Sequence, residues 1–269
     1  MNNADFDYSY QYNNWHTDTP ESCAHDMHQA KIFFDTHAIY PQQKADKVLE
    51  IGCGMGRVML MLREAGYGNL TGIDIDKSQT EIAKKQQLNI FLDDAVEFLQ
   101  KEETKYDSIY AFDVLEHIAK EKQLDLLKRI YENATEDALV ALSIPNALAP
   151  TAMLYRYEDF THTTVYTEKT IGFLLQNAGF HFFCVRPQHH ESESIQRLKL
   201  PWAKLYRHEF GIKNFILTPN LVVVAFKTKN SLEEYLKNVT PINNDYYYND
   251  SKKPRGLRRL WGHIKKLKF

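Results

Sequence analysis

The chain has 269 residues, enough to bury the core of one full domain with additions, and its formal net charge is −2. This charge argues against a general nucleic-acid surface, because proteins that neutralise many phosphates usually carry an excess of Lys and Arg. The three cysteines, Cys23, Cys53 and Cys184, are odd in number and far apart, which argues against a disulfide framework and a Cys-x-x-Cys zinc site. We therefore expect a soluble protein of the reducing cytoplasm, without a secretion signal or a bilayer-spanning segment.

The most informative stretch is a short buried strand that ends in a turn of alternating glycines. Residues 48–50 form the predicted strand, 58–65 form an amphipathic helix, and between them lie Gly52, Gly54 and Gly56. Glycines at such a turn let the backbone approach a ligand closely. Strand, glycine turn, helix and a later acid also describe the dinucleotide-binding fingerprint, but Arg57 stands where that fingerprint has its third glycine.

The next elements alternate between strands and helices along the chain. Further strands are predicted at 69–73, 89–92, 106–112, 138–144, 180–186 and 221–226, and further helices at 94–101, 120–133 and 167–179. A capping box, Ser78-Gln-Thr-Glu81, predicts another helix that runs to about residue 87. This alternation predicts an α/β fold with a seven-stranded, mostly parallel, doubly wound sheet, in which ligands sit at the carboxyl ends of the strands.

Two of these strand ends carry a family resemblance. Glu50-Ile-Gly52-Cys53-Gly54-Met-Gly56 resembles the first motif of the class I S-adenosylmethionine-dependent methyltransferases, and Gly72-Ile-Asp74 resembles the second, with the likeness covering roughly residues 44–186. The resemblance implies a Rossmann-like sheet with an antiparallel last strand, and S-adenosyl-L-methionine as cofactor. It places the cofactor on Glu50, Gly52, Cys53, Gly54, Gly56, Asp74, Ile75, Asp94, Ala95 and Asp113. The alternatives are that Asp74 is a solvated acid beside a helix, and that Asp93 replaces Asp94 in adenine binding.

The loop after the fourth strand, Phe112-Asp-Val-Leu-Glu-His117, resembles the fourth motif of small-molecule and saccharide methyltransferases. The resemblance places Asp113 beside the methionine moiety and the incoming acceptor. Glu116 and His117 either join the site or serve the local helix start. We predict no metal, although Asp113, Glu116 and His117 together offer an alternative role as ligands of a divalent metal that lowers the hydroxyl pKa.

A second candidate segment is the long loop from Pro145 to about Tyr166. Its Asp159-x-Thr-His162 resembles methyltransferases of sugars and surface glycans. We expect His162 and His117 as candidate general bases, with Asp113 and Asp159 as further catalytic residues. We expect the acceptor to be bound by Tyr155, Arg156 and Tyr157. The alternative is a structural loop in which His162 bonds to backbone.

The flanks complete the predicted organisation. We interpret residues 1–43 as a helical, aromatic lid, 44–230 as the methyltransferase domain with a helical cap insertion at about 187–214, and 231–269 as a linker and tail. In the alternative interpretation, the aromatic residues of segment 1–43 pack on the edge of the domain. Residues 252–269 contain eight Lys or Arg and no acid, with apolar residues at helical spacing, which is typical of an amphipathic helix on an anionic membrane surface. A helix docked on the protein or a disordered tail is the alternative.

These features together predict a methyltransferase acting on a hydroxyl of a saccharide or surface-glycan precursor, in the cytoplasm or peripheral on the inner membrane face. Alternative acceptors are a phosphate-containing glycan precursor and a quinone or other phenolic small molecule. A cofactor-binding partner protein without turnover is the non-enzyme alternative. We expect no nucleic-acid partner, although RNA methylation is a further alternative, and the sequence makes no prediction of oligomeric state.

Overall fold

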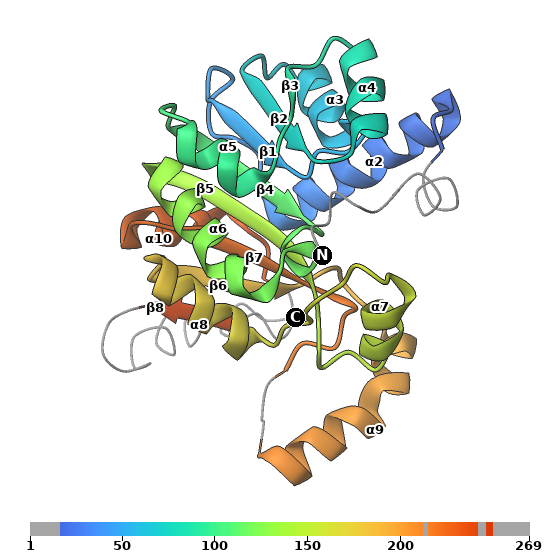
Figure 1. Ribbon diagram of the computed structural model, residues 1–269. Helices are drawn as coiled ribbons and strands as arrows, with labels where there is room; N and C mark the ends of the chain where they lie inside the picture. Colours follow the sequence, from blue (N-terminus) through green and yellow to red (C-terminus); the bar gives the residue numbers. More distant parts are fainter. Residues whose placement is uncertain (1–16, 212–214, 242–245, 250–269) are drawn as a thin grey trace.

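A single twisted sheet forms the centre of the molecule (Figure 1). The computed structural model describes residues 17–211, 215–241 and 246–249. The strands of the sheet are β1 Val48–Ile51, β2 Leu70–Asp74, β3 Ile90–Leu92, β4 Tyr106–Phe112, β5 Ala134–Pro145, β6 Phe182–Pro187, β7 Asn220–Phe226 and β8 Tyr246–Asn249. Their order is β3-β2-β1-β4-β5-β7-β6-β8, with β1 to β5 parallel and β7 antiparallel to both β5 and β6. The predicted doubly wound sheet with an antiparallel β7 is confirmed, and β8 adds an eighth strand at its edge.

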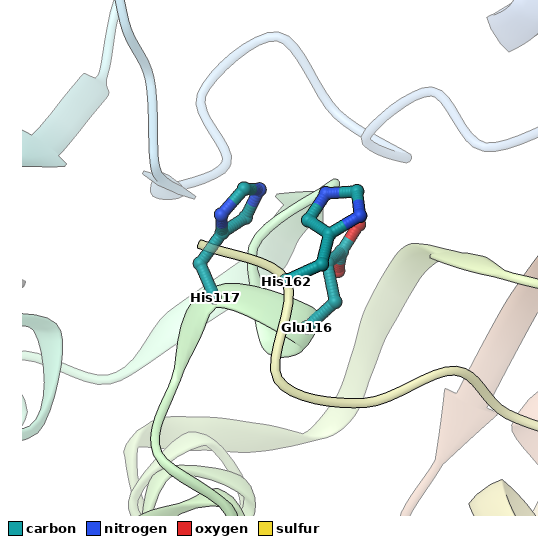
Figure 2. A group of neighbouring side chains, drawn as sticks. All are labelled: Glu116, His117 and His162. Carbon is teal, nitrogen blue, oxygen red and sulfur yellow. The ribbon is translucent and has the colours of Figure 1, made fainter. Parts of the chain in front are cut away.

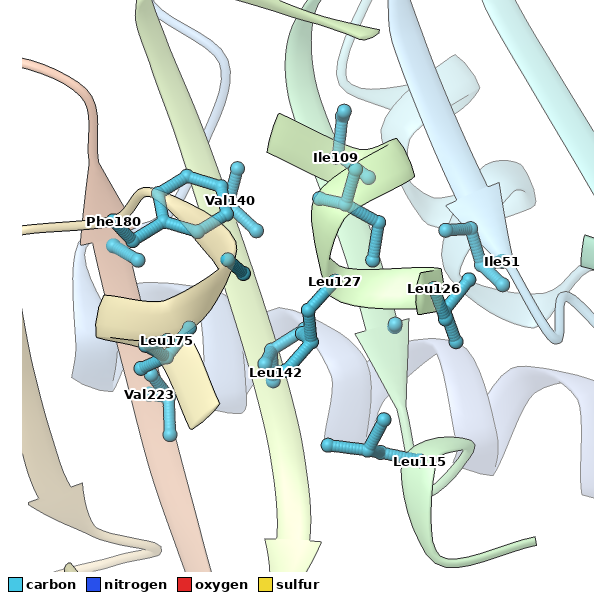
Figure 3. Close-up of a cluster of buried hydrophobic side chains, with 14 of the residues drawn as sticks. Ile51, Ile109, Leu115, Leu126, Leu127, Val140, Leu142, Leu175, Phe180 and Val223 are labelled. Atoms are coloured by element: carbon cyan, nitrogen blue, oxygen red, sulfur yellow. The ribbon is translucent and has the colours of Figure 1, made fainter. Parts of the chain in front are cut away.

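Helices cover both faces of this sheet. They are α2 Pro20–His37, α3 Arg57–Glu64, α4 Lys77–Lys85, α5 Ala95–Lys101, α6 Lys120–Asn133, α7 Ala152–Glu158, α8 Glu168–Ala178, α9 Glu193–Phe210 and α10 Lys229–Asn238, with a short 3-10 turn, η2, at Leu115–His117. Apolar residues of α5, α6 and α8 form one core cluster with the sheet, and those of α2, α3, α4 and α10 contribute to a second cluster. Figure 3 shows the first cluster, in which Leu126 and Leu127 of α6 and Leu175 of α8 lie over Val140, Leu142 and Val223 of the central strands.

Local capping explains where two of the helices begin. Thr167 caps α8 as predicted, since its hydroxyl accepts from the backbone N–H of Thr170. The predicted capping box at Ser78 is wrong, because α4 begins at Lys77 and its N-cap is Asp76. The Asp76 carboxylate accepts from the backbone N–H groups of Ser78 and Gln79, so this charged side chain takes the capping role that we assigned to Ser78.

Helix α2 lies in the segment that we predicted to be a lid, and its second half belongs to the core. Phe34 is fully buried, with its ring centroid 5.1 Å from that of Tyr110 on β4. The start of the helix instead reaches the glycine turn, where Arg57 lies 3.6 Å from Asp18 and 3.7 Å from Asp26. The second half of α2 thus packs on the sheet, and the lid stays a prediction for the rest of the segment. Residues 1–16 lie outside the described part of the chain.

A fully buried arginine joins both flanks of the domain. Arg186 of β6 donates from Nη1 to the backbone oxygen of Thr36, to Nδ1 of His37 and to the hydroxyl of Tyr235, and from Nη2 to the backbone oxygen of Thr240. Since a guanidinium only donates, the His37 proton is on Nε2, which donates to the backbone oxygen of Gln188 at 2.9 Å. Burial, with the nearby charge of Arg186, lowers the pKa of His37 to about 4.

The segment after β7 differs from the predicted linker. Helix α10 is capped by Thr228 and buries Leu232 and Tyr235 against the domain, and β8 pairs with β6. The predicted domain boundary at 231 is thus too early, because these apolar side chains complete the second core cluster. The predicted amphipathic helix at 252–269 lies outside the described residues. Within the described part of the chain, no helix has the length and apolar character required to cross a membrane.

Helix α9 occupies the range predicted as a cap insertion, and Ser192 caps it. Several apolar side chains on it are exposed, including Trp202 and Phe210. Two of the basic residues that we considered for an anionic acceptor instead make local ion pairs: Arg197 with Glu193 at 3.3 Å, and Lys199 with Glu191. The charges of Arg197 and Lys199 are therefore paired within the inserted segment.

Candidate functional site

The glycine turn between β1 and α3 has a backbone that only glycine adopts readily. Gly52, Gly54 and Gly56 have φ values of 69°, 51° and 77°, in the left-handed region. A Cβ atom added to Gly52 would lie 2.3 Å from Cγ2 of Val114, so the turn packs directly against the loop that follows β4. The glycine turn (first motif) and the loop after β4 (fourth motif) are therefore in direct contact at the carboxyl edge of the sheet.

Two acids flank this turn. The Asp74 carboxylate accepts the backbone N–H groups of Gly54 and Asp76, each at 2.8 Å, and burial raises its pKa. Each of these carboxylate oxygens has a second lone pair, which suits a ribose hydroxyl. Glu50 is 5% exposed, and within the described residues its Oε2 atom has no hydrogen-bond partner. Burial raises the Glu50 pKa well above its ordinary value, and the neighbouring Asp74 adds to this effect.

The predicted adenine-binding residues lie at the start of α5. Asp94 is the N-cap of this helix and accepts from the backbone N–H groups of Val96 and Glu97, through one oxygen, Oδ1. Asp93, the alternative, accepts from the backbone N–H of Asp94 through Oδ1. Ala95 is buried, while Ile75 beyond β2 is 41% exposed. Both acids thus have local structural roles, and the choice between them stays a prediction.

Asp113 projects from the carboxyl end of β4 with a left-handed backbone, φ 53°. Its Oδ1 atom accepts from the hydroxyl of Ser143 at 3.0 Å and from Nδ2 of Asn220 at 2.8 Å. Sequence reasoning missed these two partners, because they come from β5 and β7 and carry no local motif. They fix the direction of the Asp113 carboxylate beside the glycine turn.

Three side chains from two segments that are far apart in the sequence gather at one place (Figure 2). One atom each from Glu116, His117 and His162, of the type that binds metals, lie within 4.8 Å of one another. The rings of the two histidines are in a T-shaped arrangement with centroids 4.6 Å apart. Backbone bonds hold the segments together, since the Thr163 N–H donates to the Glu116 carbonyl at 2.7 Å. The structure thus brings the predicted His117 and His162 together with Glu116.

Hydrogen bonds define the protonated nitrogen of each ring. The Thr161 hydroxyl donates to the Asp159 carboxylate at 2.6 Å, so it can only accept from His117 Nδ1, at 2.7 Å. His162 Nδ1 lies 2.6 Å from the backbone oxygen of Tyr155, which only accepts. In the neutral form of each histidine, the proton is therefore on Nδ1 and the lone pair on Nε2. Thr161 was not among the predicted site residues, although Asp-x-Thr is a sequence in which Asp commonly bonds two residues ahead.

The cluster is electrostatically unusual. Glu116 is 1% exposed, and burial raises its pKa well above the ordinary range, with the charges of Asp113 and Asp159 adding to this effect. Burial lowers the pKa of His117 to about 4, so this ring is neutral at physiological pH. Asp159 is buried and also lies 3.7 Å from His162 Nε2 through its second oxygen. Asp159 is linked to His117 through the Thr161 hydroxyl, and its role in orienting a histidine stays a prediction.

The long loop after β5 contains the short helix α7, which was not predicted. An isolated bridge between Asn146 and Tyr166 closes its base. Tyr155 and Tyr157, predicted to bind the acceptor, are 36% and 67% exposed, and Phe160 is 83% exposed. Arg156 lies with its guanidinium 5.1 Å from the Tyr157 ring centroid. Exposed aromatic faces thus lie on the same loop as His162.

A doubly wound sheet with a glycine turn, a carboxylate after β2 and an acid after β4 is the arrangement of a class I S-adenosylmethionine-dependent methyltransferase. Comparison with known proteins agrees. A family profile described as "Methyltransferase domain" matches residues 23–185, more than half of the chain, and this chain belongs to that family. The predicted methyltransferase family is confirmed, and S-adenosyl-L-methionine is the cofactor that this family implies.

Named relatives and a solved structure support this assignment. A protein of Geobacillus sp. (strain WCH70) named as a methyltransferase is 28% identical over 117 residues, 39% of this chain and 44% of that protein. An O-methyltransferase of Penicillium expansum is 24% identical over 146 residues, 51% of this chain and 52% of that protein. The chain thus spans about half the length of these relatives. The crystal structure of a methyltransferase dependent on S-adenosylmethionine from Archaeoglobus fulgidus has a TM-score of 0.60 at 20% identity, with 81% of this chain and 99% of that chain covered.

S-adenosylmethionine fits the residues around the glycine turn. Bound in this fold, S-adenosylmethionine supplies an electrophilic methyl group on a positively charged sulfur. The left-handed glycine turn provides close backbone approach, and Asp74 provides the acceptor for ribose hydroxyls. The unpartnered Oε2 of Glu50 adds a buried acceptor beside the turn. These assignments of individual cofactor contacts stay predictions.

Proposed function

We propose that this enzyme methylates a hydroxyl group, and that its acceptor is a saccharide or a surface-glycan precursor. The observation that carries the proposal is the convergence of Glu116, His117 and His162 beside Asp113. Transfer of a methyl group to an alcohol needs two things: alignment of the oxygen with the methyl carbon, and removal of the hydroxyl proton. A cluster with two imidazole lone pairs and buried carboxylates serves the second need, either by accepting the proton or by holding a metal ion that lowers the hydroxyl pKa.

The exposed aromatic residues of the same loop support a saccharide. Tyr155, Tyr157 and Phe160 offer flat apolar faces, and Arg156 and the acids around it offer hydrogen bonds. Sugar rings present apolar C–H faces and a rim of hydroxyls, so this combination suits them. The name of the Penicillium expansum relative, an O-methyltransferase, agrees with an oxygen acceptor. A phenolic acceptor would use the same aromatic faces and is the second candidate.

The location of the reaction is part of the proposal. The basic segment 252–269 would hold the enzyme at an anionic cytoplasmic membrane surface, where lipid-linked glycan precursors are assembled. Its eight Lys or Arg residues are the supporting observation. Removal of residues 252–269 should lower binding to vesicles that contain anionic lipid, measured by co-sedimentation, and should leave cofactor affinity unchanged. Equal sedimentation of both proteins would contradict this placement.

The acceptor class is tested with isotope-labelled cofactor and sets of acceptors. The protein is incubated with S-adenosylmethionine carrying a ¹³C-methyl group and with nucleotide sugars, oligosaccharides or simple phenols, and products are identified by mass spectrometry and NMR. We expect a new methyl ether on a sugar. His162→Ala should lower turnover by about 10²- to 10⁴-fold with cofactor binding intact. Methylation of phenols alone, or of nitrogen, would overturn the saccharide assignment.

A matched aromatic control separates acceptor binding from general damage. Tyr157→Ala on α7 should raise the KM for the saccharide, whereas Phe173→Ala, on α8 and 65% exposed, should leave it unchanged. Both side chains are exposed, so neither change should alter the free energy of unfolding by more than about 0.5 kcal/mol. Equal effects of the two substitutions on KM would remove α7 from the acceptor site.

A further inference from the structure

We propose that Glu116, His117 and His162 form a binding site for one divalent transition-metal ion, and that this ion holds the acceptor hydroxyl. Binding of the ion is independent of the acceptor's identity. The role given to the ion rests on the proposed function. The assignment replaces our prediction of no metal. It also differs from the alternative ligand set, Asp113, Glu116 and His117, because His162 takes the place of Asp113.

Geometry is the first argument. One ligand atom from each of the three side chains lies within 4.8 Å of the other two. Ligand atoms about 2.0–2.2 Å from a metal are about 3 Å apart when they are neighbours in its coordination shell. Small side-chain rotations of the kind that accompany metal binding would bring the three atoms to this separation. Figure 2 shows the two rings and the carboxylate gathered at one place, although they come from the turn after β4 and the loop after β5.

The hydrogen bonds of the two rings are the second argument. His117 donates from Nδ1 to Thr161, which is itself held by Asp159, and His162 donates from Nδ1 to a backbone carbonyl. Metal-binding histidines almost always have such a partner on the nitrogen opposite the metal, because it fixes the tautomer and the ring direction. In both rings the lone pair that remains is the one on Nε2. Two histidines with this same arrangement are thus prepared as ligands.

The buried carboxylate is the third argument. Oε2 of Glu116 has no hydrogen-bond partner within the described part of the chain, although the residue is 1% exposed. An unpaired buried carboxylate oxygen is costly. A bound divalent cation would offset this cost. A loop held only by its own hydrogen bonds would not explain this unpartnered Oε2 atom of Glu116.

The ligand set indicates which ions fit. Two imidazole nitrogens with one carboxylate suit Mn²⁺, Fe²⁺, Co²⁺ or Zn²⁺, whereas Mg²⁺ and Ca²⁺ prefer oxygen ligands. Three protein ligands leave coordination positions for water or for the acceptor oxygen. Coordination lowers the pKa of that hydroxyl. The acceptor oxygen then loses its proton to solvent and forms a bond to the methyl carbon as the carbon–sulfur bond breaks, with the electron pair remaining on sulfur.

Metal binding is tested directly, without any acceptor. The untagged full-length protein is dialysed against a chelator and titrated with Mn²⁺, and free Mn²⁺ is followed by its electron paramagnetic resonance signal. We expect one ion per chain. Glu116→Gln and His162→Ala should each weaken this binding by more than about tenfold, because each removes one ligand. Retained affinity for S-adenosylhomocysteine, measured by calorimetry, shows that each variant is folded.

The chain offers a matched control for adventitious binding. His208 on α9 also lies beside a carboxylate, with its Nδ1 2.8 Å from Glu209, but both residues are exposed. His208→Ala should leave the number and affinity of bound ions unchanged. Wild-type protein that binds no Mn²⁺, Co²⁺ or Zn²⁺, or binding that is equal in wild type and in the Glu116 and His162 variants, would overturn the proposed site.

The two proposals fail in different ways. Ion binding that depends on Glu116, His117 and His162, without methylation of any hydroxyl acceptor, would support the site and overturn the proposed function. Saccharide methylation at an undiminished rate in the presence of a chelator, by a protein that binds no ion, would support the function and overturn the site.

Discussion

Substitution of Gly52 by alanine tests how the glycine turn and the loop after β4 are joined. Gly52 has φ 69°, and an L-residue in this region costs about 1–2 kcal/mol. The added Cβ would lie 2.3 Å from Cγ2 of Val114, so the two loops must move apart. Overpacking of this kind costs about 1–3 kcal/mol. We therefore expect the free energy of unfolding to fall by about 2–5 kcal/mol, a large part of the 5–15 kcal/mol typical of a domain.

A double-mutant cycle separates the two costs. Val114→Ala removes Cγ2 and leaves its Cβ 3.6 Å from the Cβ added at position 52, which is ordinary contact. The combined variant should therefore recover the overpacking cost of about 1–3 kcal/mol and retain the backbone cost. Urea unfolding of the four proteins gives these free energies, and calorimetry with S-adenosylhomocysteine gives cofactor affinity. We expect Gly52→Ala to weaken that affinity more than tenfold, with partial recovery in the double variant.

Gly68→Ala is the control for the cycle. Nothing lies within 4 Å of a Cβ built on Gly68, and its φ is not in the left-handed region. Its stability should change by no more than about 1 kcal/mol in either direction. A Gly52→Ala protein as stable as Gly68→Ala, or additive effects at positions 52 and 114, would contradict these two costs.

The remaining predictions concern one cofactor contact, one buried histidine and one hydrogen-bond relay. Asp74→Asn should weaken S-adenosylhomocysteine binding by about tenfold or more in calorimetry, because an amide replaces a charged acceptor of the Gly54 N–H and of ribose, a loss of about 1.5–3 kcal/mol; unchanged affinity would exclude Asp74 from the site. His37 is held neutral with a pKa of about 4 against 6.5, so the unfolded chain binds the proton first, and stability should fall by up to about 3 kcal/mol as the pH decreases from 6.5 to 4. His37→Gln should remove this part of the slope in urea unfolding, and parallel slopes in both proteins would contradict the assignment. Thr161→Val removes the hydroxyl between Asp159 and His117, so kcat should fall about tenfold or more with cofactor affinity unchanged, whereas Thr161→Ser should restore activity.

Much of the fold was predictable from the sequence because its signals are local. The limits of β4 and α6 agree with the predicted ranges, since apolar periodicity and the flanking polar residues define them. Two errors were local as well. Asp76 outcompeted Ser78 as a cap, and α10 was overlooked although Thr228 followed by Leu232 and Tyr235 is a capped amphipathic pattern.

The candidate site was less predictable because its residues meet through long-range contacts. Strand-end rules placed Asp74 and Asp113 at the carboxyl edge of the sheet, as observed. The approach of His162 to His117 depends on how a loop 45 residues further along folds back through Thr163. No periodicity encodes that return. The burial of Glu116 is likewise a tertiary property, since the sequence alone is equally compatible with an exposed helix start.

The Arg186 cluster has a practical consequence for dissecting this enzyme. Its guanidinium donates to acceptors that lie both before and after the catalytic motifs in the sequence, at Thr36, His37, Tyr235 and Thr240. A fragment trimmed to residues 44–230 would leave a cation in an apolar interior with its acceptors cut away. The smallest unit that can fold on its own therefore extends well past the recognisable catalytic motifs, from before α2 to beyond α10.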